Sequence, residues 1–178
     1  MLTNNQHGEI LQPSPWVMRF AALIRPGGRV LDLAAGKGRH ARALSALGFR
    51  VTAVDRDIRA LGDFPGDAIA LDLEDGGPWR LGGDWDGIVV TNYLHRPLLP
   101  AIASSLAPQG VVIYETFVVG NERFGKPARP EFLLRPGELL AAFSSLHVVA
   151  FEQGEVTTPR AAVIQRIAAA RRFPCALP

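Results

Sequence analysis

Cysteine is almost absent from this sequence: its 178 residues contain one, Cys175, close to the C-terminal end. A single cysteine cannot form an intramolecular disulfide and favours a reducing compartment, so we expect a cytoplasmic protein. The first residues lack a basic segment followed by a long apolar run, so no secretory signal is expected. No stretch approaches the roughly 20 apolar residues that span a bilayer, so we expect no membrane partner.

The sequence also lacks an excess of one charge, because 19 Lys and Arg residues face 17 Asp and Glu residues. The arginines are spread along the chain, which argues against a nucleic-acid partner. Repeats and linker-like stretches are missing too, and the apolar residues, 48% of the chain, are enough for one core. We therefore predict a single domain over 1–178, with a flexible tail (1–14) and a leading helix (15–25). The sequence leaves the oligomeric state open.

Apolar runs typical of buried strands alternate with segments of helical spacing. The predicted strands are 29–34, 49–54, 68–73, 85–91, 111–115, 147–151 and 161–169, and the predicted helices are 15–24, 39–47, 58–61, 98–106 and 136–143. The last two strands are joined by only a turn, so they must pair antiparallel. The prediction is an α/β fold: a Rossmann-like, seven-stranded, mostly parallel sheet with an antiparallel C-terminal strand and helices on both faces.

The first predicted strand contains Asp32 and opens into a turn, 34–38, that holds Gly36 and Gly38. Small residues in such a turn let the backbone approach a ligand, and the following helix directs its N-terminal amides toward it. The alternative is a plain tight turn, because glycine turns between strands and helices are common.

Polar side chains also end the next three strands. Asp55 follows the second strand, where a carboxylate can accept hydrogen bonds from both hydroxyls of a ribose; an N-cap of the next helix is the alternative. Asp72 and Leu73 end the third strand, and 91–95 follow the fourth. Because parallel strands end at one edge of a sheet, these residues predict a ligand crevice at that edge.

Together these segments resemble the class I S-adenosylmethionine-dependent methyltransferases. The resemblance rests on VLDLAAGKGRH at 30–40, VTAVD at 51–55, ALDL at 70–73 and the two closing strands. Within that class, the chain is most similar to small, insertion-free members of the tellurite-resistance type. The resemblance implies a methyltransferase that uses S-adenosylmethionine as its cofactor and methylates a small-molecule acceptor.

For the methionine end of the cofactor, the resemblance implies that Asp32 holds the amino group, directly or through water. Ala34, Gly36 and Gly38 would let the backbone come close, and Asn92 would add a backbone or side-chain contact. The family usually has glycine at the position of Ala34. Alanine costs little there if φ is negative, but it is strained at positive φ.

For the adenosine end, the resemblance implies that Asp55 binds the ribose hydroxyls and that Arg56 lies against the adenine. Asp72 would accept from the exocyclic amino group, and the Leu73 backbone would serve the ring nitrogen. An NAD-dependent oxidoreductase and a non-catalytic S-adenosylmethionine-binding protein remain as alternatives. Against NAD, the Asp32 carboxylate near the turn would repel a pyrophosphate and attract an ammonium group.

Methyl transfer from a sulfonium mainly requires that the acceptor is aligned with the methyl group and that water is excluded. A general base is needed only for acceptors such as alcohols or ammonium groups. His95 is the first candidate because its ordinary pKa lies near neutrality, and Tyr93 is the second. A hydrogen-bonded loop histidine is the alternative for His95. No metal site is predicted.

The segment 116–135 is long for a connection in a compact domain and is rich in charge, glycine and proline, so we predict a substrate-covering loop. Arg123 and Lys126 within it would favour an anionic or carboxylate-bearing acceptor. The alternative is a solvated connection whose charges bind nothing specific.

Overall fold

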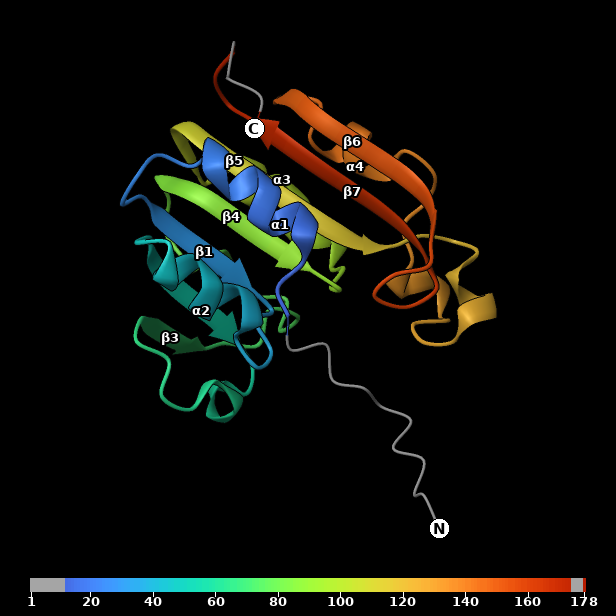
Figure 1. Ribbon diagram of the computed structural model, residues 1–178, viewed down its shortest axis with the longest axis horizontal. Coiled ribbons are helices and arrows are strands. Elements are labelled where there is room, and N and C mark those ends of the chain that lie inside the picture. The colour runs from blue at the N-terminus through green and yellow to red at the C-terminus, as the bar shows by residue number, and fades with distance from the viewer. Residues whose placement is uncertain (1–11, 174–177) are drawn as a thin grey trace.

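The computed structural model describes residues 12–173 and 178 (Figure 1). Cys175 and residues 1–11 of the expected tail lie outside the described residues. The strands are β1 (Arg29–Leu33), β2 (Arg50–Asp55), β3 (Asp67–Ala70), β4 (Trp85–Thr91), β5 (Leu106–Phe117), β6 (His147–Val156) and β7 (Ala162–Ala170). The α-helices are α1 (Pro15–Phe20), α2 (Arg39–Ala46), α3 (Leu99–Ser104) and α4 (Glu138–Ala142). Short 3-10 helices are η1 (Ala21–Leu23), η2 (Ile58–Leu61), η3 (Arg96–Leu98), η4 (Asn121–Phe124) and η5 (Pro130–Phe132).

One sheet holds these strands in the order β3-β2-β1-β4-β5-β7-β6 (Figure 1). β1 pairs in parallel with β2 and β4, β2 with β3, and β4 with β5. β7 runs antiparallel between β5 and β6. The predicted fold class is therefore confirmed. Because the strand order reverses between β1 and β4, the ligand crevice typical of such sheets lies outside the carboxyl ends of these two strands.

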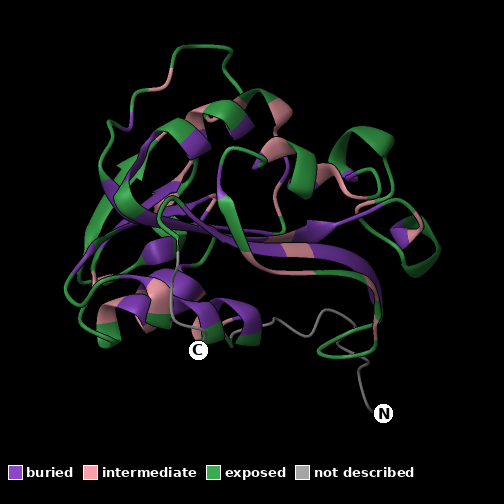
Figure 2. Ribbon diagram, turned by 90° about the horizontal axis from the view of Figure 1, so that it is seen from above, coloured by how far each residue is buried: buried purple, intermediate pink, exposed green. Residues whose placement is uncertain are grey.

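Helices cover both faces of the sheet, and each face has its own apolar core. On one face, α1 and α2 pack with Val30 and Val89, and on the other, α3 and α4 pack with Leu31 and Ile88. Neighbouring strand residues point to opposite faces, so adjacent residues such as Val30 and Leu31 belong to different cores. Figure 2 shows the sheet as a buried layer between more exposed segments. Burial on both faces explains why the central strands are continuous apolar runs in the sequence.

Several element boundaries differ from the prediction. β3 ends at Ala70, so Asp72 and Leu73 lie in the turn after the strand and not at its last positions. All four residues of β3 are exposed at the sheet edge, so no buried face extends the strand. β5 is much longer than the predicted 111–115, because it pairs with β4 on one side and with β7 on the other. The predicted helix 98–106 ends at Ser104, since β5 begins at Leu106.

The segment that leads into α1 is attached to α2 and to the end of β5. Ser14 is buried, and its side-chain oxygen caps α1 by accepting a hydrogen bond from the Trp16 amide (3.2 Å). The Ser14 hydroxyl also donates to Glu115 Oε1 (2.9 Å), and its amide donates to His40 Nε2 (3.0 Å). The last described part of the expected tail is therefore held by β5 and α2. Among the described residues, no helix is long and apolar enough to cross a membrane.

Candidate active site

The turn after β1 owes its shape to three positive φ angles, at Ala34 (53°), Gly36 (56°) and Gly38 (75°). At Gly38 a side chain is also excluded by space, because a Cβ there would lie 2.7 Å from Leu61 Cδ2. At Gly36 a Cβ would meet no atom within 4 Å, so the turn borders open space. Ala34 adopts the conformation in which alanine is strained, at a cost of roughly 1–2 kcal/mol.

Asp32 is a buried carboxylate at the base of this turn. Its side chain is 1% exposed, and within the described residues its Oδ2 has no hydrogen-bond partner. Burial raises the pKa of Asp32 from 3.8 to about 7, although the Ala41 amide and the charge of Arg39 act in the opposite direction. A buried carboxylate oxygen without a partner is costly, so a cationic or hydrogen-bonding ligand beside it would relieve the cost.

Asp55 at the end of β2 is connected to the same turn. Its Oδ2 accepts a hydrogen bond from the Gly36 amide (2.8 Å), and its Oδ1 accepts one from the Asp57 amide (3.1 Å). The carboxylate is half-buried, and each of its oxygens has lone pairs left for a further donor. The predicted alternative role for this residue, the N-cap of the next helix, falls to Asp57, whose side chain accepts from the Arg59 amide and caps η2.

The remaining residues predicted for the adenosine end lie at the open side of this edge. Arg56 and Asp72 are exposed, and Leu73 is half-buried. Asp72 Oδ1 accepts from the Glu74 amide (2.9 Å), which shapes the turn after β3. Asp55 and Asp72 both lie near enough to Tyr93 to influence its pKa, so the ends of β2, β3 and β4 form one acidic region.

A cleft of about 630 Å³ lies beside the end of β4. It is walled by the segment 12–15, the start of α2, the ends of β4 and β5, and the connection between β6 and β7. Among the predicted cofactor residues, Asn92 alone lines it. Asn92 has a positive φ of 55°, and its amide donates to the Glu115 carbonyl (2.9 Å). The carboxyl ends of the strands thus border two places: the acidic region near β2, β3 and β4, and the cleft near β4 and β5.

Charged side chains from adjacent strands form one wall of the cleft. Arg166 of β7 pairs with Glu115 of β5 (3.2 Å) and also with Glu152 of β6, and its guanidinium carbon lies 4.7 Å from the centre of the Trp16 ring. Glu115 and Arg166 line the cleft, and sequence reasoning did not assign Arg166 to the site. The available signal was a single arginine within the apolar strand 162–170, because a charge in a buried strand needs a partner.

The two predicted catalytic residues follow β4 but lie outside the cleft lining. The Tyr93 hydroxyl is buried and makes no hydrogen bond within the described residues. Burial, together with the nearby carboxylate of Glu74, raises its pKa well above its ordinary value, so the phenol stays protonated at neutral pH and is suited to donate a hydrogen bond. His95 is half-buried, and its carbonyl accepts from the Leu98 amide (3.0 Å). A catalytic role for either residue stays a prediction.

The predicted substrate residues are both exposed on the loop between β5 and α4. Arg123 forms an ion pair with Glu155 of β6 and lies over the ring of Phe124, at 4.9 Å. Neither Arg123 nor Lys126 lines the cleft, although Glu155 does. Arg123 therefore touches the rim of the cleft through its ion-pair partner, whereas no contact of Lys126 with the cleft is seen.

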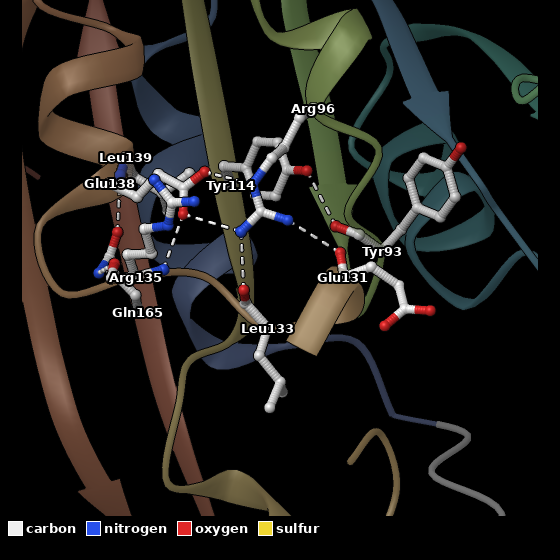
Figure 3. Close-up of polar contacts among 9 residues, drawn as sticks. All are labelled: Tyr93, Arg96, Tyr114, Glu131, Leu133, Arg135, Glu138, Leu139 and Gln165. Atoms are coloured by element: carbon white, nitrogen blue, oxygen red, sulfur yellow. Dashed lines mark hydrogen bonds and ion pairs between the residues drawn. The ribbon is translucent and has the colours of Figure 1, made fainter. Parts of the chain in front are cut away.

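The same loop is fastened to the segment after β4 by Arg96 of η3 (Figure 3). The Arg96 guanidinium donates to Glu138 Oε1 (2.7 Å) and to the carbonyls of Glu131 (2.9 Å) and Leu133 (2.8 Å). In Figure 3 the Tyr93 ring points away from this cluster, while the Tyr93 carbonyl accepts from the Tyr114 hydroxyl (2.9 Å). Arg96 thus fixes the position of the loop relative to the strand end that carries Asn92 and Tyr93.

His40 connects the N-terminal segment at the cleft to the end of β4. It is 2% exposed on α2, and its Nε2 accepts from the Ser14 amide while its Nδ1 lies 3.2 Å from the Thr91 hydroxyl. Burial, with a smaller contribution from Arg39, lowers the pKa of His40 from 6.5 to about 3. The neutral imidazole therefore holds the N-terminal segment against the end of β4.

Comparison with known proteins decides the family. Residues 6–131, more than half of the chain, match the family described as methyltransferase domain. The chain belongs to this methyltransferase family. The resemblance deduced from the sequence is therefore confirmed, as is the expected enzyme class. No curated protein sequence matches the chain.

Solved structures show that the methyltransferase fold extends over most of the chain. TehB from Haemophilus influenzae aligns with a TM-score of 0.69 at 19% identity, over 88% of this chain and 61% of TehB, so this chain spans less than two thirds of that relative. A TehB-like SAM-dependent methyltransferase from Corynebacterium glutamicum aligns with a TM-score of 0.62 at 20% identity, over 86% of this chain and 87% of that one. The 1,6-didemethyltoxoflavin-N1-methyltransferase of Burkholderia thailandensis, with bound 1,6-didemethyltoxoflavin and S-adenosylhomocysteine, aligns with a TM-score of 0.59 at 23% identity. The alignment covers 87% of this chain and 75% of that one.

Proposed function

We propose that this chain is an S-adenosylmethionine-dependent methyltransferase that acts on a small, anionic acceptor. The observation that carries the proposal is the buried Asp32 carboxylate, whose Oδ2 has no hydrogen-bond partner within the described residues, beside a turn that borders open space. Membership in the methyltransferase family supports it, as does the S-adenosylhomocysteine bound by the structural relative from B. thailandensis.

The chemistry of the donor set fits this cofactor. A partnerless carboxylate oxygen at Asp32 suits an ammonium group, and the lone pairs of Asp55 suit vicinal hydroxyls. Gly36 leaves room for close approach of the backbone, and Gly38 shapes the turn. Ala34 and Asn92 would contribute to the methionine end, as the family resemblance implies. Arg56, Asp72 and Leu73 would hold the adenine at the open end. The family resemblance implies these assignments, and the positions of the residues around one sheet edge support them.

When bound, the cofactor supplies a methyl group on a sulfonium: a lone pair of the acceptor forms the new bond to carbon, and the electron pair of the breaking carbon–sulfur bond returns to sulfur. The chain must align the acceptor and exclude water. The cleft walls and the loop fastened by Arg96 would do both. Tyr93 would donate a hydrogen bond on the cofactor side, and His95 would take up a proton where the acceptor carries one.

Calorimetric titration with S-adenosylmethionine, S-adenosylhomocysteine and NAD tests the cofactor assignment. We expect the first two to bind and NAD not to bind. Asp55→Ala should weaken both by about a hundredfold or more, because two hydrogen bonds to a charged group are lost. Asp63→Ala is the matched control, since the Asp63 side chain is fully exposed and pairs with Arg42.

Binding of NAD alone would replace the proposal with the oxidoreductase alternative. Binding of S-adenosylmethionine without turnover on any acceptor would favour the non-catalytic alternative. Equal loss of affinity in Asp55→Ala and Asp63→Ala would mean that Asp55 does not contact the ligand.

A further inference from the structure

The cleft is distinct from the residues proposed for the adenosine end, and its composition describes a different ligand. Asp55, Arg56 and Asp72 do not line it. Its apolar part includes Phe117 from β5 and Ala162 and Ile164 from β7, which belong to a small separate core. Its volume of about 630 Å³ lies within the range of pockets that bury organic ligands. An apolar wall of this size would be of no use to an inorganic oxyanion.

Some of the charged side chains around this apolar wall have ion-pair partners, and one arginine has none within the described residues. Arg166 is neutralised by Glu115 and Glu152, and Glu155 is neutralised by Arg123. Arg160 also lines the cleft, and within residues 12–173 it has no carboxylate partner. Its guanidinium carbon lies 5.4 Å from the centre of the Phe117 ring. The cleft therefore presents a cation without a counter-ion directly beside an aromatic surface.

A second arginine strengthens the positive potential at the inner end. Arg39, at the start of α2, lines the cleft and lies near enough to Arg160 for the like charge to help lower its pKa, after the larger effect of burial. Arg39 is also close to Asp32 and Glu115. An anionic group between these arginines would gain from both charges, whereas a cationic group would be repelled.

We propose that the cleft binds an organic acceptor with an apolar, planar body and a carboxylate, the body lying against Phe117 and Ile164 and the carboxylate pairing with Arg160. This inference rests on the proposed methyltransferase function and names the acceptor class. It moves the anion-binding role from Arg123 and Lys126 to Arg160. Asn92, a predicted cofactor residue that lines the cleft, marks where the acceptor would meet the methyl group.

The test uses 2-naphthoate as the probe, with 2-naphthamide as its neutral counterpart and selenite as an inorganic oxyanion. Binding is measured by calorimetry or ligand-observed NMR with the full chain saturated with S-adenosylhomocysteine. We expect naphthoate to bind about tenfold more tightly than naphthamide, since a charge-assisted hydrogen bond is strong in a cleft. Arg160→Gln should remove this preference, and Arg160→Lys should retain part of it.

Two further variants separate the apolar and the charged contributions. Ala162→Leu narrows the apolar wall and should weaken both naphthyl probes without changing the preference for the carboxylate. Arg129→Gln is the matched control, because Arg129 is an exposed arginine outside the cleft that pairs with Glu131. It should leave both affinities unchanged. Thermal unfolding of each variant checks that it is folded.

Equal affinity of the wild-type chain for naphthoate and naphthamide would overturn the proposal, as would a preference that survives in Arg160→Gln. Selenite binding that depends on Arg160, without naphthoate binding, would overturn the organic acceptor in favour of an oxyanion. Failure of S-adenosylhomocysteine to bind at the outset is a separate result, because it contradicts the proposed function and not the composition of the cleft.

Discussion

The two parts of the site carry opposite charges. The first part contains the carboxylates of Asp32 in β1, Asp55 in β2 and Asp72 after β3, whereas the cleft beside β5 and β7 contains arginines, of which Arg160 lacks a carboxylate partner in the described chain. The proposed function puts a cationic group in the first part and an anionic group in the second. Such a difference in charge would help to orient two ligands at one sheet edge.

The largest expected effect concerns His40, which connects Ser14 at the cleft to Thr91 at the end of β4. Its folded pKa of about 3 lies below the ordinary value of 6.5, so the stability that comes from the neutral imidazole is complete above pH 6.5 and is lost as the pH falls toward 3. Between pH 6.5 and 4.5 this contribution should fall by about 2–3 kcal/mol. Urea unfolding of the wild type and of His40→Gln at these pH values measures it.

The glutamine keeps an acceptor near the position of Nε2 but does not titrate, so the stability of His40→Gln should depend less on acid than that of the wild type. His147→Gln is the control, because His147 is exposed and its replacement should preserve the wild-type pH dependence. Parallel curves for all three proteins would show that His40 is not the group that makes the fold acid-sensitive.

The second effect concerns Asp32 in the acidic part. With a pKa of about 7, roughly a tenth of this carboxyl is ionised at pH 6 and most of it at pH 8. If the ionised form holds the ammonium group, affinity for S-adenosylhomocysteine should rise about tenfold between these pH values, and Asp32→Asn should abolish the rise. Calorimetry across this range provides the measurement.

The raised pKa of Asp32 also predicts that stability depends on pH with the opposite sign to the contribution of His40. Its folded pKa is raised, so its contribution is complete below pH 3.8 and is lost as the pH rises through 7. Ligand-free Asp32→Asn should therefore be more stable than the wild type at pH 8. Asp86→Asn is the control: Asp86 is buried but paired with Arg25, and its replacement should leave the pH dependence of affinity intact.

The smallest effect concerns the strained alanine in the turn. Ala34→Gly should stabilise the chain by up to about 1 kcal/mol. The strain energy of alanine at positive φ, which glycine removes, exceeds the free-energy cost of the extra entropy that glycine gives the unfolded state. Ala35→Gly, one position later without positive φ, should be destabilising. Thermal or urea unfolding compares the two. A destabilised Ala34→Gly would mean that the methyl group makes contacts worth more than the strain.

Prediction from the sequence succeeded where burial on both faces leaves a pattern. The apolar run around Asp32 identified β1, the run that ends at Asp55 identified β2, and the seven strands and their helices followed. The edge strand β3 was placed less well, because its residues are exposed and nothing in the pattern marks its end at Ala70. The long β5 was predicted too short because Gln109 and Gly110 interrupt its apolar run. The ladder with β4 passes over them, from Leu106 to Val111, at an irregularity in the register, and the ladder with β7 extends the strand to Phe117.

The cleft was harder to predict than the turn because it joins segments that are distant in the sequence. Ser14, Glu115 and Arg166 meet through hydrogen bonds and an ion pair that span about 50 residues or more. No local spacing indicates such contacts. Arg123 and Lys126 were predicted because they lie in a charged loop. Arg160 lies in the short connection between β6 and β7, where no charge pattern indicates a site. Of these three residues, Arg160 alone lines the cleft.

The position of β7 in the sheet has a consequence for the order in which this chain can assemble. β7 is synthesised after β6 but lies inside it, between β6 and β5. While a ribosome is still making residues 162–170, β5 has an open edge and β6 has no neighbour to pair with. The Glu115–Arg166 wall of the cleft therefore cannot exist before the last strand is made, so a nascent chain could complete its glycine turn well before it could hold an acceptor.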